Sequence, residues 1–163
     1  MLFLVESLPL TECLWLASRG LCAKNSFATN NVNECRIADN LSFLFLQTLG
    51  CYDVVAYFTQ SAPVKGNSEF VYVWKGGKWY FANRENQEAF KASPEKYAPQ
   101  YGGYCAYGTA GGYKAPTDPD AWTVSDGKLY LNYNKKVMEN WRKDQANFID
   151  KANKNWPTVK LQE

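Results

Sequence analysis

The stretch Phe70-Val71-Tyr72-Val73-Trp74-Lys75-Gly76-Gly77-Lys78-Trp79-Tyr80-Phe81 decides the fold of this chain. β-Branched and aromatic residues fill both of its ends, and such side chains favour extended strands. Between them lies Gly76-Gly77, and glycine pairs supply the positive φ angles that a tight hairpin turn requires. We therefore predict an antiparallel hairpin with strands over Phe70–Trp74 and Trp79–Phe81.

A second hairpin is predicted further along the chain. Ala121–Val124 and Lys128–Tyr133 flank Asp126-Gly127, a dipeptide typical of two-residue hairpin turns. Ahead of the first hairpin, the short apolar run Val54–Phe58 is expected to form another strand.

Between the hairpins, Asn83 is a suitable N-cap for a helix from about Arg84 to Ala92. Ser93 followed by Pro94 indicates a further helical start, with Ser93 as the cap. The segment Gln100–Pro116 holds five glycines and four tyrosines, and we predict a loop there.

The chain is expected to end in a long amphipathic helix from about Lys135 to Asn155. Apolar side chains recur there at three- and four-residue steps, and Pro157 is expected to stop the helix. These elements in this order predict an α+β fold: a small antiparallel sheet built from two hairpins, with a short helix and the long C-terminal helix packed on it. The expected core comprises Val55, Tyr57, Phe70, Tyr72, Trp79, Phe81, Phe90, Trp122, Leu129, Leu131, Trp141 and Ile149.

Composition excludes several chemistries. The chain has no histidine, so Ser-His-Asp and Cys-His catalysis and histidine-based metal sites are ruled out in their usual forms. No Cys-x-x-Cys pair is present. The formal net charge is +2 without a basic run, which gives no support for nucleic-acid binding, and no apolar stretch is long enough to span a membrane. Carboxylates remain available as general acids and bases, but no pattern brings two of them together.

The N-terminal residues differ in composition from the rest. Four of the five cysteines lie at or before Cys51, whereas every tyrosine lies at or after Tyr52. We therefore expect a poorly defined segment over residues 1–50, with at most a short helix over 41–49, and a domain over residues 51–163. Five is an odd number, so at least one thiol stays unpaired within the chain. Residues 1–10 lack a positively charged start and make a poor secretory signal.

The sequence Tyr52-Asp53-Val54-Val55-Ala56-Tyr57-Phe58 resembles the opening element of the YHS-domain family, with Val54 where proline is usual. The resemblance continues through Trp79–Ala82, the block Pro94–Gly108 and the second hairpin to Asn155-Trp156-Pro157. It covers about residues 52–157. Members of this family are often exported, whereas residues 1–10 make a poor secretory signal. The sequence therefore does not determine the cellular compartment.

The metal-binding branch of the family carries cysteine ligands at positions that fall here on Ala56, Ala82 and Asn86. The resemblance therefore implies an uncharacterised branch that lacks the metal-binding cysteines. Without thiolates or imidazoles, affinity for soft or borderline metals is lost, because only carboxylate and amide oxygens remain.

Within the domain, the sequence leaves two readings of the candidate site open. Cys105 is either a buried core residue or a functional thiol, which would be a single-thiolate ligand for copper or zinc, a redox-active cysteine, or a cofactor contact beside Tyr104 and Tyr107. The tyrosines around the glycine-rich segment either pack internally or line a binding surface. The candidate ligand-binding residues are Tyr101, Tyr104, Cys105, Tyr107 and Tyr113.

Three functions follow from these readings. We favour a non-catalytic module that binds a small molecule or a protein. The alternative is a metal-handling protein that binds copper or zinc through Cys105, and a small enzyme using carboxylates and tyrosines is third. If the first holds, the domain needs no metal cofactor.

Overall fold

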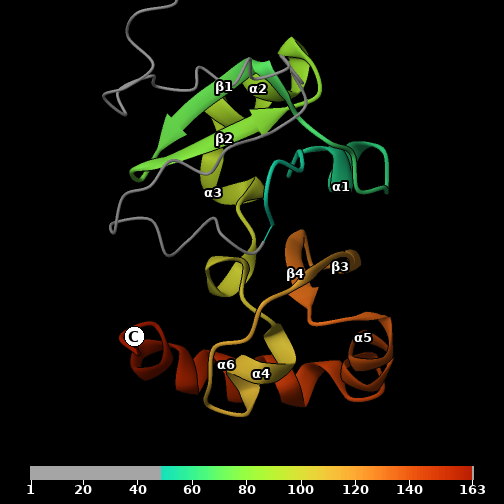
Figure 1. Ribbon diagram of the computed structural model, residues 1–163. Coiled ribbons are helices and arrows are strands. Elements are labelled where there is room, and N and C mark those ends of the chain that lie inside the picture. The colour runs from blue at the N-terminus through green and yellow to red at the C-terminus, as the bar shows by residue number, and fades with distance from the viewer. Residues whose placement is uncertain (1–48, 163) are drawn as a thin grey trace, which may run out of the picture. The chain divides into compact units, whose positions relative to one another are not determined.

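The computed structural model describes residues 49–162, all within one compact unit (Figure 1). The α+β class is confirmed. The strands are β1 (Asn67–Trp74), β2 (Gly77–Phe81), β3 (Asp118–Ser125) and β4 (Lys128–Asn132). The helices are α1 (Ala56–Thr59), α2 (Arg84–Ala92), α3 (Pro94–Tyr97), the 3₁₀ helix η1 (Gln100–Gly103), α4 (Ala106–Ala110), α5 (Lys135–Arg142) and α6 (Gln145–Val159). The helix predicted over residues 41–49 lies outside the described residues, apart from Leu49.

The first hairpin forms as predicted, but its turn lies one residue earlier than expected. Trp74 pairs with Gly77, so Lys75 and Gly76 are the central residues, with φ of 48° and 78°. Lys75 accepts this left-handed conformation although it is not glycine. The preference of glycine for turns therefore identified the hairpin but not its register.

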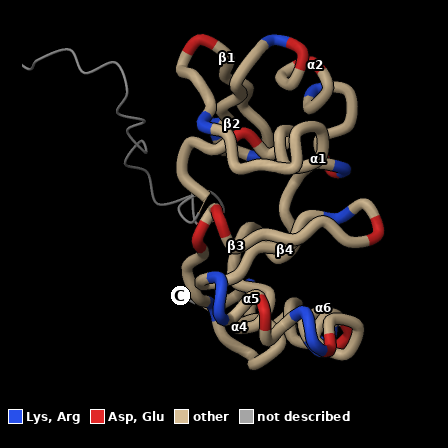
Figure 2. Tube along the Cα trace, turned by 90° about the vertical axis from the view of Figure 1, so that its right-hand side faces the viewer, with Lys and Arg blue, Asp and Glu red and all other residues tan. Residues whose placement is uncertain are grey.

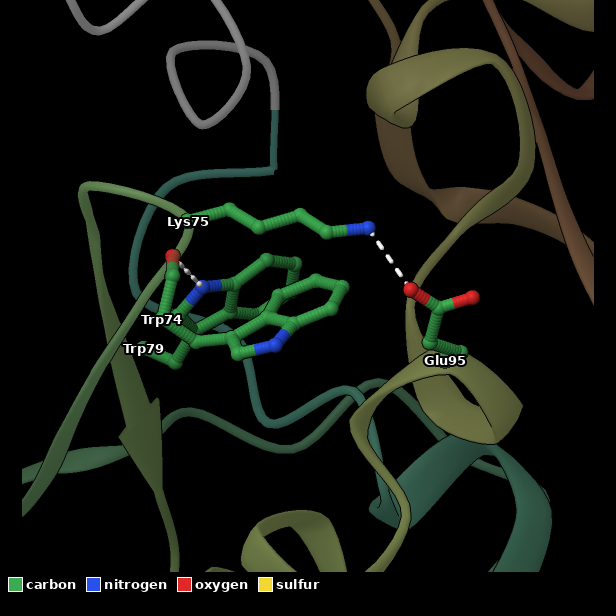
Figure 3. A network of polar contacts seen from close by, with 4 residues as sticks. All are labelled: Trp74, Lys75, Trp79 and Glu95. Carbon is green, nitrogen blue, oxygen red and sulfur yellow. Dashed lines mark hydrogen bonds and ion pairs between the residues drawn. The ribbon is translucent and has the colours of Figure 1, made fainter.

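Aromatic packing at the hairpin tip accounts for this register. The rings of Trp74 and Trp79 meet edge to face with centroids 5.6 Å apart, and Trp79 Nε1 donates to Trp74 O at 3.2 Å. Lys75 Nζ lies 4.4 Å from the centroid of the Trp74 ring and 2.8 Å from Glu95 Oε1 in α3 (Figure 3). Both ends of that ion pair are exposed, so it contributes little beyond covering the indole.

The second hairpin turns at Asp126 and Gly127, with φ of 49° and 68°, as predicted. The predicted single sheet is wrong in one respect. Within residues 49–162 the two hairpins form separate two-stranded sheets. They are joined by side chains rather than by backbone hydrogen bonds, because Leu129 and Leu131 of β4 share one core cluster with Phe81 of β2.

Strand β4 separates two hydrophobic clusters. Its side chains alternate between two faces, as in any strand. Leu129 and Leu131 enter the first cluster, around Trp79, Phe81 and Phe90. Tyr130 enters the second, which is defined by Tyr101, Ala106, Tyr130, Trp141 and Ala152. The strand is consequently buried on both sides from Leu129 to Asn132.

The predicted core is largely confirmed. Phe81 is fully buried, so the predicted inward face of its strand is correct. Eight of the predicted core residues are buried: Val55, Tyr57, Trp79, Phe81, Phe90, Leu129, Leu131 and Trp141. Four are only partly buried: Phe70, Tyr72, Trp122 and Ile149.

The strand predicted over Val54–Phe58 is wrong, because the chain forms helix α1 at this point. Asp53 Oδ1 accepts hydrogen bonds from Val55 N at 2.8 Å and Ala56 N at 3.3 Å, which turns the backbone into a helical start. A short apolar run does not by itself distinguish a buried helix from a strand. The signal available in the sequence was Asp53, because an aspartate readily accepts hydrogen bonds from the backbone N–H groups that follow it.

The other oxygen of Asp53 reaches across the fold. Oδ2 accepts from Ala82 N at 2.8 Å, just after β2, and from Asn86 Nδ2 in α2 at 2.6 Å. The side chain is fully buried, and none of the described ion pairs involves it. Four N–H donors therefore replace water around this carboxylate and fix α1 against β2 and α2.

Helix α2 begins as predicted, since Asn83 Oδ1 accepts from Asn86 N at 2.8 Å. Ser93 precedes α3 at the predicted position, but its side chain makes no capping bond. The predicted C-terminal helix is divided: α5 ends at Arg142, and α6 starts after Asp144, whose backbone leaves the helical region and whose carboxylate binds Asn147 Nδ2 at 2.8 Å.

A further expectation about the C-terminal helix, that Pro157 stops it, is wrong. Pro157 lies inside α6 instead of ending it. The long helix α6 packs on α4 (Figure 1), whereas the shorter α5 contacts the second hairpin. The predicted apolar stripe is therefore divided between two helices that pack against different elements.

Replacement of Asp53 is expected to destabilise the domain strongly. Asp53→Ala leaves buried donors unsatisfied, and each unsatisfied group costs about 1–3 kcal/mol, so the free energy of unfolding should fall by at least about 3 kcal/mol. Urea denaturation measures this. Asp126→Asn, at an exposed turn position that suits asparagine, is the matched control and should change stability by less than about 0.5 kcal/mol. Similar stability of the two variants would contradict the role of Asp53.

Candidate functional site

The segment Gln100–Pro116 was predicted as a loop, and the structure corrects this by placing η1 and α4 within it. The chain enters α4 through a left-handed turn in which Tyr101, Gly102 and Gly103 have φ of 53°, 59° and 80°. Two of the three are glycines, as this region favours. Tyr101 is not, and a bulky residue there costs about 1–2 kcal/mol.

Contacts with α6 and β4 offset the strain at Tyr101. Its hydroxyl donates to Asn153 Oδ1 at 2.9 Å, and its ring lies against Tyr130 and Trp156 at centroid distances of 6.0 and 5.9 Å. Burial raises the pKa of Tyr101, and the neighbouring Tyr130 raises it further. Tyr101 is thus an internal anchor, with 5% of its surface exposed.

Cys105 is buried and starts helix α4. Its Sγ accepts from Gly108 N at 3.4 Å and lies 3.7 Å from Asn132 Oδ1, toward which the thiol donates. Cys105 also forms a parallel bridge with Leu131, which attaches this segment to β4. Cys105 is a free thiol, whereas Cys51 is disulfide-bonded, so the two are not paired with each other.

Asn132 is a site residue that sequence reasoning missed. It is fully buried at the end of β4, and its Oδ1 also accepts from Tyr107 N at 3.3 Å. One amide oxygen thereby holds both the thiol and the first turn of α4. An asparagine on the same face as Tyr130, in a strand otherwise rich in apolar residues, was the signal in the sequence.

The three remaining tyrosines stay at the surface to different degrees. Tyr104 is half-buried, with Lys114 Nζ 5.5 Å from its ring centroid, and burial raises its pKa. Tyr107 is 36% exposed and packs on Phe148 of α6 at 4.9 Å. Tyr113 is 52% exposed.

Gly108 in α4 and Gly111 directly after it make room for the Tyr113 ring. A Cβ atom at Gly111 would lie 2.9 Å from Tyr113 Cε1, and one at Gly108 would lie 3.1 Å from Cε2. The backbone also folds back, because Tyr113 N donates to Gly108 O at 3.1 Å. These glycines therefore serve close packing of an aromatic ring on a helix.

Helix α4 and the turn after it are fixed to α6 by side-chain amides. Asn155 Nδ2 donates to Thr109 O at 3.3 Å and to Ala110 O at 3.0 Å, which satisfies carbonyls at the end of α4. Gln162 Nε2 donates to Gly112 O at 2.9 Å, and Lys114 Nζ returns a bond to Gln162 O. The exposed tyrosines are therefore presented on an anchored segment.

The electrostatic setting is mixed rather than of one sign. Basic and acidic residues both occur along α5 and α6, and both signs also occur on the hairpins (Figure 2). Within residues 49–162, no three His, Cys, Asp or Glu side chains gather into a group that would hold a metal ion. None of the helices in that range has the length and apolar character needed to cross a membrane.

Residues 55–101 match the family model of the YHS domain. The match runs from the start of α1 through the first hairpin and α2 to η1, and it covers less than half of the chain. No curated protein matches the chain, and no solved structure does. A YHS domain over these residues is therefore supported, while the resemblance noted beyond residue 101, including the block around Cys105, stays a prediction.

The structure brings together Ala56, Ala82 and Asn86, the three positions where the sequence resemblance predicted the cysteines of the metal-binding branch to fall. Ala56 N, Ala82 N and Asn86 Nδ2 all donate to the carboxylate of Asp53. A buried hydrogen-bond network therefore joins these positions in this chain.

The predicted ligand-binding residues fall into two groups. Tyr101 and Cys105 are buried and position the segment, whereas Tyr104, Tyr107 and Tyr113 present ring surface. Whether any of the five contacts a ligand stays a prediction, and so does a metal on Cys105.

Alkaline pH is expected to destabilise the domain through its buried tyrosines. Burial raises the pKa of Tyr57 and Tyr101 above the ordinary 10.0, so the unfolded chain loses these protons first. Their contribution is complete below about pH 10 and is lost as the pH rises toward the folded-state pKa. Tyr101→Phe should make the fall in stability above pH 10 shallower, as measured by urea denaturation at several pH values. An unchanged slope would contradict this assignment.

Removal of the Asn132 side chain is expected to loosen the start of α4. Asn132→Ala leaves Tyr107 N without its acceptor, so the free energy of unfolding should fall by about 2–3 kcal/mol and the Tyr107 amide should exchange faster with deuterium. Asn140→Ala, on the exposed face of α5, is the control. If the Tyr107 amide stays protected from deuterium exchange in Asn132→Ala, Asn132 does not hold the first turn of α4.

Proposed function

We propose that this domain is a non-catalytic binding module for a small molecule or a protein, whose ligand contacts the surface formed by Tyr104, Tyr107 and Tyr113. Tyr101 and Cys105 act behind that surface as positioning residues. The observation that carries the proposal is the exposure of Tyr107 and Tyr113, at 36% and 52%, on a segment that α6 holds in place.

Rigid presentation favours binding for an entropic reason. A tyrosine ring offers a large contact area with few rotatable bonds, so little conformational entropy is lost when a ligand is bound. The backbone N–H of Tyr107 donates to Asn132 Oδ1, and the backbone N–H of Tyr113 donates to Gly108 O. The backbone at both tyrosines is therefore held in place before any ligand binds. A ligand would therefore meet a largely preformed surface.

The mixture of groups near these rings favours a ligand with an apolar or aromatic part. Phe148 extends the ring surface of Tyr107, and Lys151 Nζ lies 5.9 Å from the Phe148 centroid. Lys114 lies over Tyr104 in a similar way. Polar groups are thus available around the ring faces to orient such a ligand.

Fragment screening by NMR tests this proposal. A library of planar aromatic fragments is titrated against the ¹⁵N-labelled protein, and we expect the largest shift changes at Tyr104, Tyr107 and Tyr113. Tyr113→Ala should weaken the binding of a hit at least about tenfold, whereas Val73→Ala, an exposed apolar position on β1, should leave it unchanged. Hits that map to other surfaces and tolerate Tyr113→Ala would overturn the assignment.

The metal-handling alternative is decided by a parallel titration. Copper and zinc are added to the wild type and to Cys105→Ala while thermal unfolding is followed. Our proposal expects no metal-dependent difference between the two proteins. Stoichiometric binding that is lost in Cys105→Ala would assign metal handling to the domain instead.

A further inference from the structure

Two buried hydrogen-bond donors have no partner among the described residues: Trp141 Nε1 in the second cluster, and Asn132 Nδ2 on the same face of β4 as Tyr130. Asn132 and Trp141 are both fully buried. An unsatisfied buried N–H group costs about 1–3 kcal/mol, so native proteins rarely retain two without an acceptor.

The orientation of the Asn132 amide is fixed by its neighbours. Tyr107 N–H donates to one atom of this amide at 3.3 Å, and that atom must be the oxygen because an NH₂ group cannot accept. The thiol of Cys105 faces the same oxygen. Reversal of the amide is therefore unfavourable, and Nδ2 remains the unpartnered end.

Two lines of contact connect Trp141 with Asn132 through neighbouring residues. Tyr130 stacks on Trp141 at 5.3 Å and lies on the same face of β4 as Asn132, two residues earlier. Ala106 belongs to the same cluster as Trp141, and its chain neighbours Cys105 and Tyr107 both contact the Asn132 oxygen. Strand β4, α4 and α5 all contact one another, so both unpartnered donors lie on elements that meet in one region.

The two unpartnered N–H groups indicate what kind of molecule binds here. Both groups are donors, so they need an acceptor, and none of the buried charged or polar side chains in the described range is cationic. A buried anion with no cation and only two N–H donors, against the four that surround Asp53, would carry a large desolvation penalty. A water molecule accepts from two donors and suits a site of this kind, since buried waters typically bind two to four polar groups.

We propose that the second cluster contains a binding site for one internal water molecule, which accepts from both Asn132 Nδ2 and Trp141 Nε1. This water would link α5 to the end of β4 and hold the Asn132 amide in the orientation that binds Tyr107 N and Cys105. The inference does not depend on the proposed ligand surface, although the same asparagine supports that segment.

A high-resolution crystal structure and water-selective NMR of the wild type test the proposal. We expect an ordered oxygen within hydrogen-bond distance of both nitrogens, and cross-peaks from a long-lived water to the Asn132 side-chain amide and to the Trp141 indole proton. No ordered atom there, a protein acceptor on either nitrogen, or a water on only one of them would overturn it.

Trp141→Phe provides a second test because it removes one of the two donors. The water cross-peak to the Asn132 amide should then be lost, since a water with fewer partners exchanges faster. Persistence of that cross-peak in Trp141→Phe would show that the indole does not hold the water. If this variant does not fold, the two wild-type measurements still decide the question.

Discussion

The fold depends on the buried carboxylate of Asp53. A charge inside a protein is tolerated only when it is paired or fully hydrogen-bonded, and four N–H groups from three parts of the chain meet this need. The same bonds start α1 and hold it against the end of β2 and against α2. Tyr57 of α1 then donates to Pro119 O at 3.1 Å, which carries the attachment on to the second hairpin. Two sheets without shared hydrogen bonds are thereby brought to one core.

Strand β4 connects this first core to the tyrosine-containing segment Gln100–Pro116. Leu129 and Leu131 belong to the first cluster. On the other face, Tyr130 belongs to the second cluster, and Asn132 binds Cys105 and Tyr107 N. Because a strand presents alternate residues to opposite sides, one five-residue element builds two environments, one apolar and one containing polar groups. Cys105, α4 and α5 are placed against the second, and α6 covers α4.

The five candidate binding residues do different work because their burial differs. Tyr101 accepts backbone strain and is held by Asn153 and by two aromatic rings, which is the behaviour of an anchor rather than of a mobile contact. Cys105 is enclosed by an amide and a backbone N–H. Of the five, only Tyr104, Tyr107 and Tyr113 keep part of their surface exposed. A cluster of tyrosines in sequence is therefore not one site, since neighbours on a tight turn point to different surroundings.

The sequence by itself determined both hairpins, the cap of α2 at Asn83 and most of the core. It also showed the YHS-domain resemblance over residues 55–101. Those features follow from local preferences: β-branched and aromatic runs, turn dipeptides and capping side chains act within a few residues. Only the tertiary structure decided that Val54–Phe58 is helical, that α4 lies within the glycine-rich segment and that Pro157 is inside α6. It also revealed Asn132. These outcomes rest on contacts between residues far apart in the chain, such as Asp53 with Asn86 and Asn155 with the end of α4, and local preference carries no information about such partners.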